Sequence, residues 1–323
     1  MLDQYGRVIN YLRISVTDRC NLRCCYCMPE GVQDVGMENI LTFEEIWEIV
    51  RTGVSLGITH IRITGGEPLV RKGCVDLIRG IREIPGVETI TMTTNGVLLG
   101  NYAKQLKEVG VDSVNISLDT LDPEEFYKIT GKRELQEVLA GIRAAKTAGL
   151  QVKLNAVNRK ELDPLPLVRY AQKENLPLRF IEMMPVGYGK KYVGRSNEEL
   201  RKTLTTVCGN PERITDREKL SRMGSGPAVY YRFSDLKVPV GFISAIHGKF
   251  CDSCNRIRLT AEGYLKLCLC YDEGEDLRRV LREGEKENLR TIMEQTIFQK
   301  PAAHCFEHPE EMTETHEMVK IGG

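Results

Sequence analysis

The sequence YLRISVTDRCNLRCCYC, residues 11–27, joins a strand pattern directly to a cysteine-rich loop. Its first six residues alternate in character, so the apolar side chains share one face of the predicted strand and Arg13 and Ser15 share the other. The cysteines begin at Cys20, just beyond the carboxyl end of the strand. The segment therefore predicts a strand with one polar face, followed by a loop suited to holding a metal centre.

The same unit recurs along the chain, as β-branched runs alternate with longer amphipathic segments. The predicted strands are Tyr11–Val16, Ile58–Thr64, Val87–Thr93, Asp112–Leu118, Gln151–Val157 and Pro177–Met183. The predicted helices are Thr42–Leu56, Cys74–Glu83, Asn101–Val109, Leu135–Ala148, Pro164–Glu174 and Asn197–Val207. Six strand–helix units predict a parallel sheet with helices outside it, two units short of a closed eightfold barrel. We therefore expect an α/β fold, an incomplete (β/α)6 barrel, over residues 1–210.

Side-chain parity gives each of these strands one apolar face and one largely polar face. In the sixth strand, for example, Ile181 and Met183 oppose Glu182 and Met184. We expect the polar faces to line the lumen, and an unpaired polar group in a dry lumen would cost ~1–3 kcal/mol. A large polar ligand inside the barrel is therefore expected. The alternative is a flat sheet with one solvated face, which is disfavoured because parallel sheets are usually covered on both sides.

Residues 211–323 follow a different pattern, which predicts an α+β extension. Its predicted strands are Ala228–Phe233, Val238–Ser244, Asn255–Leu259 and Tyr264–Leu267, and its predicted helices are Asp276–Arg282 and Lys286–Gln299. The last stretch, Lys300–Gly323, has little periodicity and is expected to be an extended or mobile tail.

Composition narrows the class of protein further. The 45 Lys and Arg balance the 45 Asp and Glu, so an anionic ligand must be held by local clusters, and nucleic acid is disfavoured as a partner. No apolar run approaches the ~20 residues that span a bilayer, and the N-terminal residues lack the apolar core of a signal peptide. We expect a cytoplasmic protein with no membrane partner. In that compartment, 11 cysteines indicate metal or redox chemistry.

Three of these cysteines, Cys20, Cys24 and Cys27, follow the spacing C-x3-C-x2-C. Three thiolates on one loop suit a [4Fe–4S] cluster with one iron left open to chelate a small molecule. Zinc is the alternative, although zinc sites favour four protein ligands and other spacings. Cys25 does not fit the spacing and is predicted to be a spare thiol.

A second cysteine set, Cys251, Cys254 and Cys268, follows C-x2-C-x13-C and predicts a second cluster with an open iron. Zinc is a stronger alternative here, because C-x2-C pairs are common zinc holders. Cys270 is a possible fourth thiolate that ranks below the three-ligand interpretation.

Arginines follow the second cysteine pair. Arg256 and Arg258 share one face of a predicted strand, and two adjacent guanidiniums repel unless an anion lies between them. A solvated strand edge is the alternative. Together with Arg13, Arg62 and Lys153 from the lumen, these residues would suit a polyphosphate.

The motif C-x3-C-x2-C, with Tyr26 before its last cysteine, resembles the radical S-adenosylmethionine superfamily, and so does the glycine-rich TGGEP at residues 64–68. The resemblance implies a full or partial β/α barrel and a cluster whose open iron binds S-adenosylmethionine, which is cleaved to a 5′-deoxyadenosyl radical. The turn at TGGEP brings backbone close to a ligand, and its glutamate is suited to pairing with an ammonium. A simple tight turn would explain TGGEP equally well. The residues implied to bind the cofactor are Tyr26, Gly66, Glu67, Ser117 and Met184.

The whole chain resembles the GTP 3′,8-cyclase family of molybdenum cofactor biosynthesis. The resemblance rests on both cysteine sets, TGGEP, the KLN of the fifth strand, RFIE-x-MP, Arg256-x-Arg258 and the terminal Gly322-Gly323. It implies that the second [4Fe–4S] cluster contacts the guanine and that the diglycine, Gly322 and Gly323, enters the active site and aids catalysis. The residues implied to bind GTP are Arg13, Arg62, Thr93, Lys153, Arg256 and Arg258.

This resemblance also implies the reaction and the partners. The radical would remove the hydrogen at C3′ of GTP, and C3′ would attack C8 to give 3′,8-cyclo-7,8-dihydro-GTP. An external one-electron reductant would serve the first cluster, and cyclic pyranopterin monophosphate synthase would act downstream, while a homodimer is left open. Two alternatives are a radical peptide maturase with an auxiliary cluster and a zinc-stapled binding module.

Overall fold

The computed structural model describes residues 1–322 except 32–34, 193, 217, 219, 221, 222, 225 and 285. Within this part of the chain, 12 strands form one sheet in the order β12-β11-β10-β1-β2-β3-β4-β5-β6-β9-β8-β7. The six strands of the expected barrel are β1 (Tyr11–Ser15), β2 (His60–Thr64), β3 (Thr89–Thr94), β4 (Ser113–Ser117), β5 (Gln151–Asn158) and β6 (Leu178–Glu182). They pair in parallel in chain order, as the sequence predicts.

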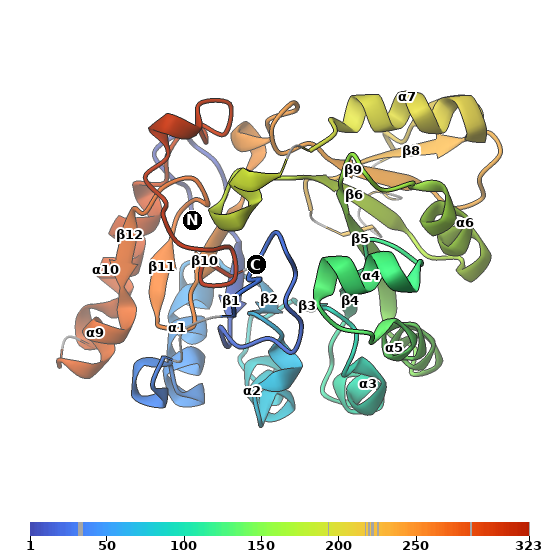
Figure 1. The fold of residues 1–323 in the computed structure, drawn as a ribbon. Helices are drawn as coiled ribbons and strands as arrows, with labels where there is room; N and C mark the ends of the chain where they lie inside the picture. Colours follow the sequence, from blue (N-terminus) through green and yellow to red (C-terminus); the bar gives the residue numbers. More distant parts are fainter. Residues whose placement is uncertain are drawn as a thin grey trace.

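Helices cover the outside of this sheet (Figure 1). They are α1 (Phe43–Ser55), α2 (Cys74–Arg82), α3 (Leu99–Glu108), α4 (Pro123–Thr130), α5 (Leu135–Thr147), α6 (Leu165–Glu174) and α7 (Asn197–Cys208). All but α4 match predicted helices. Thr42 begins α1 with a capping box, because its hydroxyl accepts from the Glu45 amide while the Glu45 carboxylate accepts from the Thr42 amide.

The C-terminal part extends the sheet at both ends. Strand β10 (Arg256–Leu259) pairs in parallel with β1, and β9 (Val240–Ile243) pairs in parallel with β6. Antiparallel strands then form the two edges: β11 (Tyr264–Lys266) and β12 (Gly274–Asp276) on one side, β8 (Val229–Phe233) and β7 (Pro211–Arg213) on the other. The expected incomplete barrel with a C-terminal extension is confirmed. A domain division at residue 210 stays a prediction, since one sheet runs through both parts.

The apolar core lies between the sheet and the outer helices. In β3, Ile90 and Met92 are fully buried, whereas Thr91 and Thr93 are partly exposed toward the inside of the barrel. In the first five strands, as expected, the apolar side chains face the outer helices and the alternate, largely polar side chains face the inside of the barrel. In β6 this expectation holds only in part: Glu182 and Met184 line the cavity as expected, but Arg179, Ile181 and Met183 line it as well, while Phe180 lies in the core.

The last segment is not the extended or mobile tail that we expected. After α9 (Leu277–Arg282) and α10 (Leu289–Phe298), the chain turns back across the barrel mouth, as the red segment of Figure 1 shows. Phe306 and Ile321 are buried with Val186 in a second, smaller core. The Lys266 ammonium also forms a buried ion pair with Glu314. Low sequence periodicity therefore reflects a coil that packs through long-range contacts.

Among the described residues, no helix has the length and apolar character needed to cross a membrane. Gly323 lies outside the described residues.

Candidate active site

A cavity of about 360 Å³ occupies the inside of the barrel. Both cysteine sets predicted to hold clusters line it: Cys20, Cys24, Cys27, Cys251, Cys254 and Cys268. Residues more than 200 positions apart in the sequence thus meet at one site, because β10 lies next to β1 in the sheet.

The first cysteine loop follows β1 and forms a tight turn in which the Cys27 amide donates to the Cys24 carbonyl at 2.9 Å. The Cys20 sulfur accepts from the Leu22 amide at 3.4 Å and from Asn95 Nδ2 at 3.6 Å. Burial raises the pKa of Cys20 to about 11 and that of Cys27 to about 12. Without a bound cation these thiols would stay protonated, so a metal centre is needed to hold them as thiolates.

Gly66 allows the TGGEP turn to approach the cysteine loop. Its amide donates to the Thr17 carbonyl at 2.7 Å, and the next amide donates to the Arg19 carbonyl at 2.8 Å. A side chain at Gly66 would place Cβ only 2.3 Å from the Arg19 carbonyl oxygen. The glycine is therefore required by packing against the chain just before Cys20, and its backbone also lines the cavity.

Glu67 holds the same region from behind. Its fully buried carboxylate accepts from the Leu69 amide at 3.1 Å, the Thr94 hydroxyl at 2.8 Å and the Asn95 amide at 2.7 Å. Burial, only partly offset by these bonds, raises its pKa to about 7. Glu67 does not line the cavity, and its hydrogen bonds instead hold the end of β2 against the end of β3. Its pairing with an ammonium stays a prediction.

Three other residues predicted to bind the cofactor, Tyr26, Ser117 and Met184, line the cavity. The Tyr26 hydroxyl donates to Asp119 Oδ2 at 2.8 Å, and Asp119 Oδ1 accepts from the Val157 amide at 2.8 Å. Tyr26 thus ties the cysteine loop to the carboxyl ends of β4 and β5.

The spacing of candidate ligand atoms can be compared with what a single zinc ion needs. Zinc, with Zn–S distances of ~2.3 Å, would hold tetrahedral thiolates about 3.8 Å apart. Among the described residues, the only three metal-binding side chains whose ligand atoms gather within 4.8 Å are His308, Glu310 and Glu311. Neither cysteine trio gathers its sulfur atoms within this 4.8 Å limit.

The remaining candidate ligands lie apart from these trios. Cys25 does not line the cavity, and its sulfur accepts from Arg159 at 3.5 Å, which agrees with a spare thiol. The Cys270 sulfur lies 2.8 Å from that of Cys305, behind the cavity wall in the smaller core. This packing disfavours Cys270 as a fourth cluster ligand.

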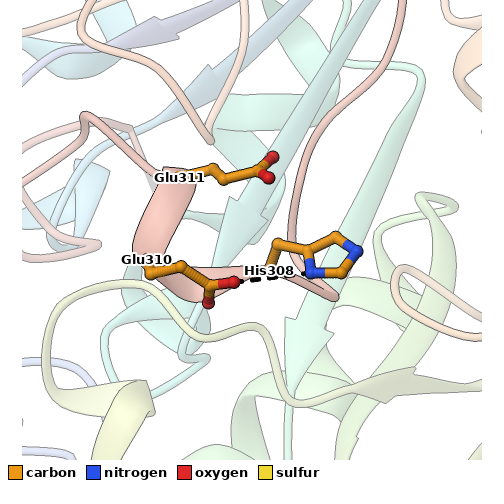
Figure 2. A group of neighbouring side chains, drawn as sticks. All are labelled: His308, Glu310 and Glu311. Atoms are coloured by element: carbon orange, nitrogen blue, oxygen red, sulfur yellow. Dashed lines mark ion pairs between the residues drawn. The ribbon is translucent and has the colours of Figure 1, made fainter.

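Figure 2 shows the exposed group on the turn near Pro309–Glu311, where His308 Nδ1 and Glu310 Oε1 form an ion pair at 3.5 Å. All three side chains are solvated, and this arrangement is an ordinary surface pair.

The second cysteine loop lies beside positive charge. Cys251 and Cys254 flank a short 3₁₀ turn, η4 (Cys251–Ser253), and Cys268 follows β11. Burial alone would raise the pKa of the Cys254 thiol, but Lys300 and Arg256 hold it below its usual value. These two cations make the Cys254 thiol easier to deprotonate than an ordinary cysteine.

Arginines form a row across three neighbouring strands, because Arg258 of β10 pairs in register with Arg13 of β1, and Arg13 with Arg62 of β2. All three line the cavity, together with Arg256. Burial and the neighbouring guanidiniums lower the pKa of Arg13 and lower that of Arg258 to about 10. Such a row of like charges in a cavity would be stabilised by an anion placed among them.

Other predicted substrate residues differ in their placement. The Thr93 hydroxyl lines the cavity and has no hydrogen-bond partner among the described residues. Lys153 is buried outside the cavity wall, beside Gly224. Arg179, which was not predicted from the sequence, lines the wall and donates to Asn155 Oδ1 at 2.8 Å. The RFIE motif contains it, but strict alternation in β6 placed it on the apolar face.

Gly322 contacts the arginine row. Its carbonyl accepts from Arg13 Nη2 at 3.3 Å and from Arg258 Nη1 at 3.1 Å. Its φ of 86° lies in the left-handed region that favours glycine. The end of the described chain thus reaches the arginine row.

Comparison with known proteins agrees with this geometry. The Radical SAM superfamily model matches residues 14–162, and the Molybdenum Cofactor Synthesis C model matches residues 176–306. The GTP 3′,8-cyclase of Clostridium perfringens strain SM101 is 43% identical over the full length of both chains. That of Peptoclostridium acidaminophilum is 45% identical over 100% of this chain and 98% of its own.

The chain belongs to the GTP 3′,8-cyclase family. Family membership carries S-adenosylmethionine and an iron–sulfur cluster as cofactors, and the loop of Cys20, Cys24 and Cys27 fits that cluster.

Solved structures confirm the fold. Streptococcus suis SuiB bound to S-adenosylmethionine matches with a TM-score of 0.65 at 14% identity, over 97% of this chain and 77% of that chain. The structure of native anSMEcpe with bound AdoMet matches with a TM-score of 0.58 at 18% identity, over 92% and 82%. At these identities the likeness concerns the radical SAM fold alone.

Proposed function

We propose that this chain converts GTP to 3′,8-cyclo-7,8-dihydro-GTP, the first step of molybdenum cofactor biosynthesis. One observation carries the proposal: a single cavity holds two separate cysteine trios and a row of arginines. A site for S-adenosylmethionine alone needs only one trio. The second trio and the arginines provide for a second, anionic ligand of nucleotide size.

Cys20, Cys24 and Cys27 would hold the first [4Fe–4S] cluster, and Cys251, Cys254 and Cys268 the second. When bound, S-adenosylmethionine and the first cluster would supply the 5′-deoxyadenosyl radical needed to remove the C3′ hydrogen of GTP. Tyr26, Gly66, Ser117 and Met184 shape the wall on which the cofactor rests. The second cluster, with one iron free of protein ligands, would meet the guanine.

The arginine row binds the triphosphate. Each close ion contact contributes about 4 kcal/mol before desolvation at an effective dielectric near 20. Burial dehydrates the guanidiniums of Arg13 and Arg258, and Arg62 lies in register beside Arg13, so a polyphosphate would relieve the mutual repulsion of the row. Held in this way, GTP would present C3′ to the radical in a fixed orientation, which lowers the entropic part of the barrier.

Gly322 links the C-terminal segment to the same row. Because its carbonyl accepts from both Arg13 and Arg258, it holds two guanidiniums in fixed positions before substrate arrives. The proposed catalytic contribution of Gly322 and Gly323 would include this positioning.

The proposed partners follow from the chemistry. A radical cleavage needs an external one-electron reductant, and the cyclic product would pass to cyclic pyranopterin monophosphate synthase. We propose that the reaction takes place in the cytoplasm, where GTP and a reducing environment are available.

The test compares ligands that stimulate 5′-deoxyadenosine formation. Anaerobically reconstituted protein is supplied with dithionite and S-adenosylmethionine, then with GTP, ATP or a peptide mixture. We expect GTP alone to accelerate formation, and a Cys24→Ser variant to abolish it. Stimulation by peptides and not by GTP would contradict the proposal and favour a peptide maturase.

A further inference from the structure

Arg7 lies at the meeting point of three segments that are far apart in the sequence. Its guanidinium donates to the Cys251 carbonyl at 2.9 Å, in the second cysteine loop. It also donates to the Ala302 carbonyl at 2.8 Å and the Pro301 carbonyl at 2.7 Å, in the segment that crosses the barrel mouth. A further bond reaches the Lys300 carbonyl at 3.3 Å.

The fifth donor of Arg7 is used as well. Nε donates to Asp3 Oδ2 at 2.6 Å, while the Arg7 amide donates to Asp3 Oδ1 at 2.9 Å. Arg7 is 8% exposed and Asp3 is 3% exposed, so the pair is shielded from water. All five N–H groups of the guanidinium therefore have an acceptor, which only the planar fork of arginine provides.

The segment that Arg7 holds also reaches the cavity. Lys300 and His304 line the cavity wall, and the ammonium of Lys300 donates to the Leu267 carbonyl, next to Cys268. The backbone at Cys251 is thus connected to Arg7 directly and that beside Cys268 through Lys300, while the Cys254 amide donates to the same Cys251 carbonyl at 3.0 Å. No residue of the proposed S-adenosylmethionine wall contacts Arg7 in the described structure.

We infer that Arg7, fixed by Asp3, is a positioning residue for the second iron–sulfur cluster and has no such role for the first. The inference rests on the proposed function, which supplies the second cluster. Because Asp3 offsets the charge of Arg7, the effect is geometric: the fork holds the Cys251 backbone at the distance that the cluster needs. Outer partners of metal ligands act in this way, and their loss typically costs about 10–100-fold in metal affinity or activity.

The test separates the two clusters. One background carries Cys20→Ser, Cys24→Ser and Cys27→Ser and retains only the second set. The other carries Cys251→Ser, Cys254→Ser and Cys268→Ser and retains only the first. Arg7→Lys, which keeps the charge but loses the fork, is introduced into each. Asp3→Asn is a second variant, which frees the guanidinium from its anchor.

The matched control is Arg82→Lys. Arg82 likewise binds backbone, donating to the Gly110 carbonyl at 2.5 Å, and pairs with Asp112 at 2.7 Å, but it lies at the other end of the strands from the cysteines. Its replacement reports what the loss of an arginine–backbone contact does to the fold in general.

Iron release to a chelator is measured anaerobically after reconstitution, beside the thermal unfolding midpoint. We expect Arg7→Lys to speed iron loss about 10–100-fold in the second-set background and less than about twofold in the first-set background. Asp3→Asn should act in the same direction, and Arg82→Lys should leave both rates unchanged.

Equal acceleration in both backgrounds, or none in the second-set background, would overturn the role of Arg7. If the second-set background with Arg7 intact binds no iron and sulfide, the second cluster of the proposed function is itself wrong, and the inference falls with it.

Discussion

At the scale of single residues, Gly66 and Glu67 show how the chain shapes a metal site without touching the metal. Gly66 brings the TGGEP turn against the Arg19 carbonyl, and Glu67 joins that turn to the end of β3 by two hydrogen bonds, from the Thr94 hydroxyl and the Asn95 amide. Asn95, fixed by Glu67, then donates to the Cys20 sulfur. The motif therefore reaches the cluster through the chain that carries the first cysteine.

Gly66→Ala tests this packing. The new Cβ would lie 2.3 Å from a carbonyl oxygen, so the cysteine loop must move, at a cost of about 1–3 kcal/mol. We expect iron per chain to fall from about eight toward about four, since only the second cluster would stay filled. Gly100→Ala is the control, because its added Cβ would lie 4.0 Å from the nearest atom, the Cα of Gly141. This variant should keep its full iron content. Full iron in Gly66→Ala would show that the close approach is not required.

The lowered pKa of the Lys153 ammonium leads us to predict that GTP binding depends on pH. Burial, with Arg179 and Arg62 nearby, lowers its pKa to about 8. In the free protein it is charged below pH 8 and increasingly neutral above it, whereas a bound triphosphate would favour the charged form. Above pH 8 binding must therefore take up a proton, and the dissociation constant should rise by up to about tenfold per pH unit.

Equilibrium dialysis from pH 7 to pH 9 measures this slope. Lys153→Arg keeps its charge over the range and should bind with a flatter profile, so the difference between the two proteins isolates Lys153 from the titration of the ligand. Identical profiles would mean that Lys153 does not feel the phosphate.

Residue-level prediction from the sequence succeeded where a motif and its strand position agreed. The two cysteine trios and the arginines of β1, β2 and β10 were predicted, and they meet in one cavity. Arg179 was missed because alternation misassigned the faces of β6. Lys153 and Glu67 were predicted as ligand contacts but lie behind the wall, a difference that depends on tertiary packing and leaves no local signal.

At the scale of elements, the C-terminal segment depends on a buried ion pair. Lys266 on β11 and Glu314 have side chains that are 3% and 0% exposed. Removing one partner of such a pair typically costs about 3–5 kcal/mol, because the other charge stays buried. The segment carries Gly322, so its attachment to β11 matters for the site.

We expect Glu314→Leu to release this segment. Limited proteolysis with mass spectrometry should then detect cleavage beyond residue 300, while the barrel stays intact. The double variant Lys266→Met with Glu314→Leu removes both charges and should restore much of the protection, because an apolar pair of similar size is often neutral in stability. Protection of the single variant equal to that of the parent would show that other contacts hold the segment.

The bounds of most helices and strands were predicted to within a few residues. In these elements the periodic pattern of apolar residues ends next to a glycine or proline that also ends the element. Helix α4 was missed although Asp122 and Pro123 form a clear start signal, with the Asp122 side chain capping the helix. The placement of β9 and β10 at opposite ends of the barrel could not be predicted, since strand order depends on long-range pairing.

At the scale of the whole molecule, the sheet explains why two cysteine trios and a row of arginines share one cavity. β10 brings the second cysteine loop beside β1, and the first loop follows β1 directly. The chain end then covers the mouth, with Gly322 against β1 and β10 (Figure 1). The fold thus encloses the space in which a radical would be shielded from water.

The most direct test follows one hydrogen atom. Reconstituted protein is given dithionite, S-adenosylmethionine and GTP deuterated at C3′, and the 5′-deoxyadenosine is analysed by mass spectrometry. We predict that the 5′-deoxyadenosine carries one deuterium, because the radical formed in this cavity takes the hydrogen from C3′ of the bound nucleotide. Deoxyadenosine without deuterium would contradict GTP as the substrate. No deoxyadenosine from protein that holds iron and sulfide would contradict the radical chemistry itself.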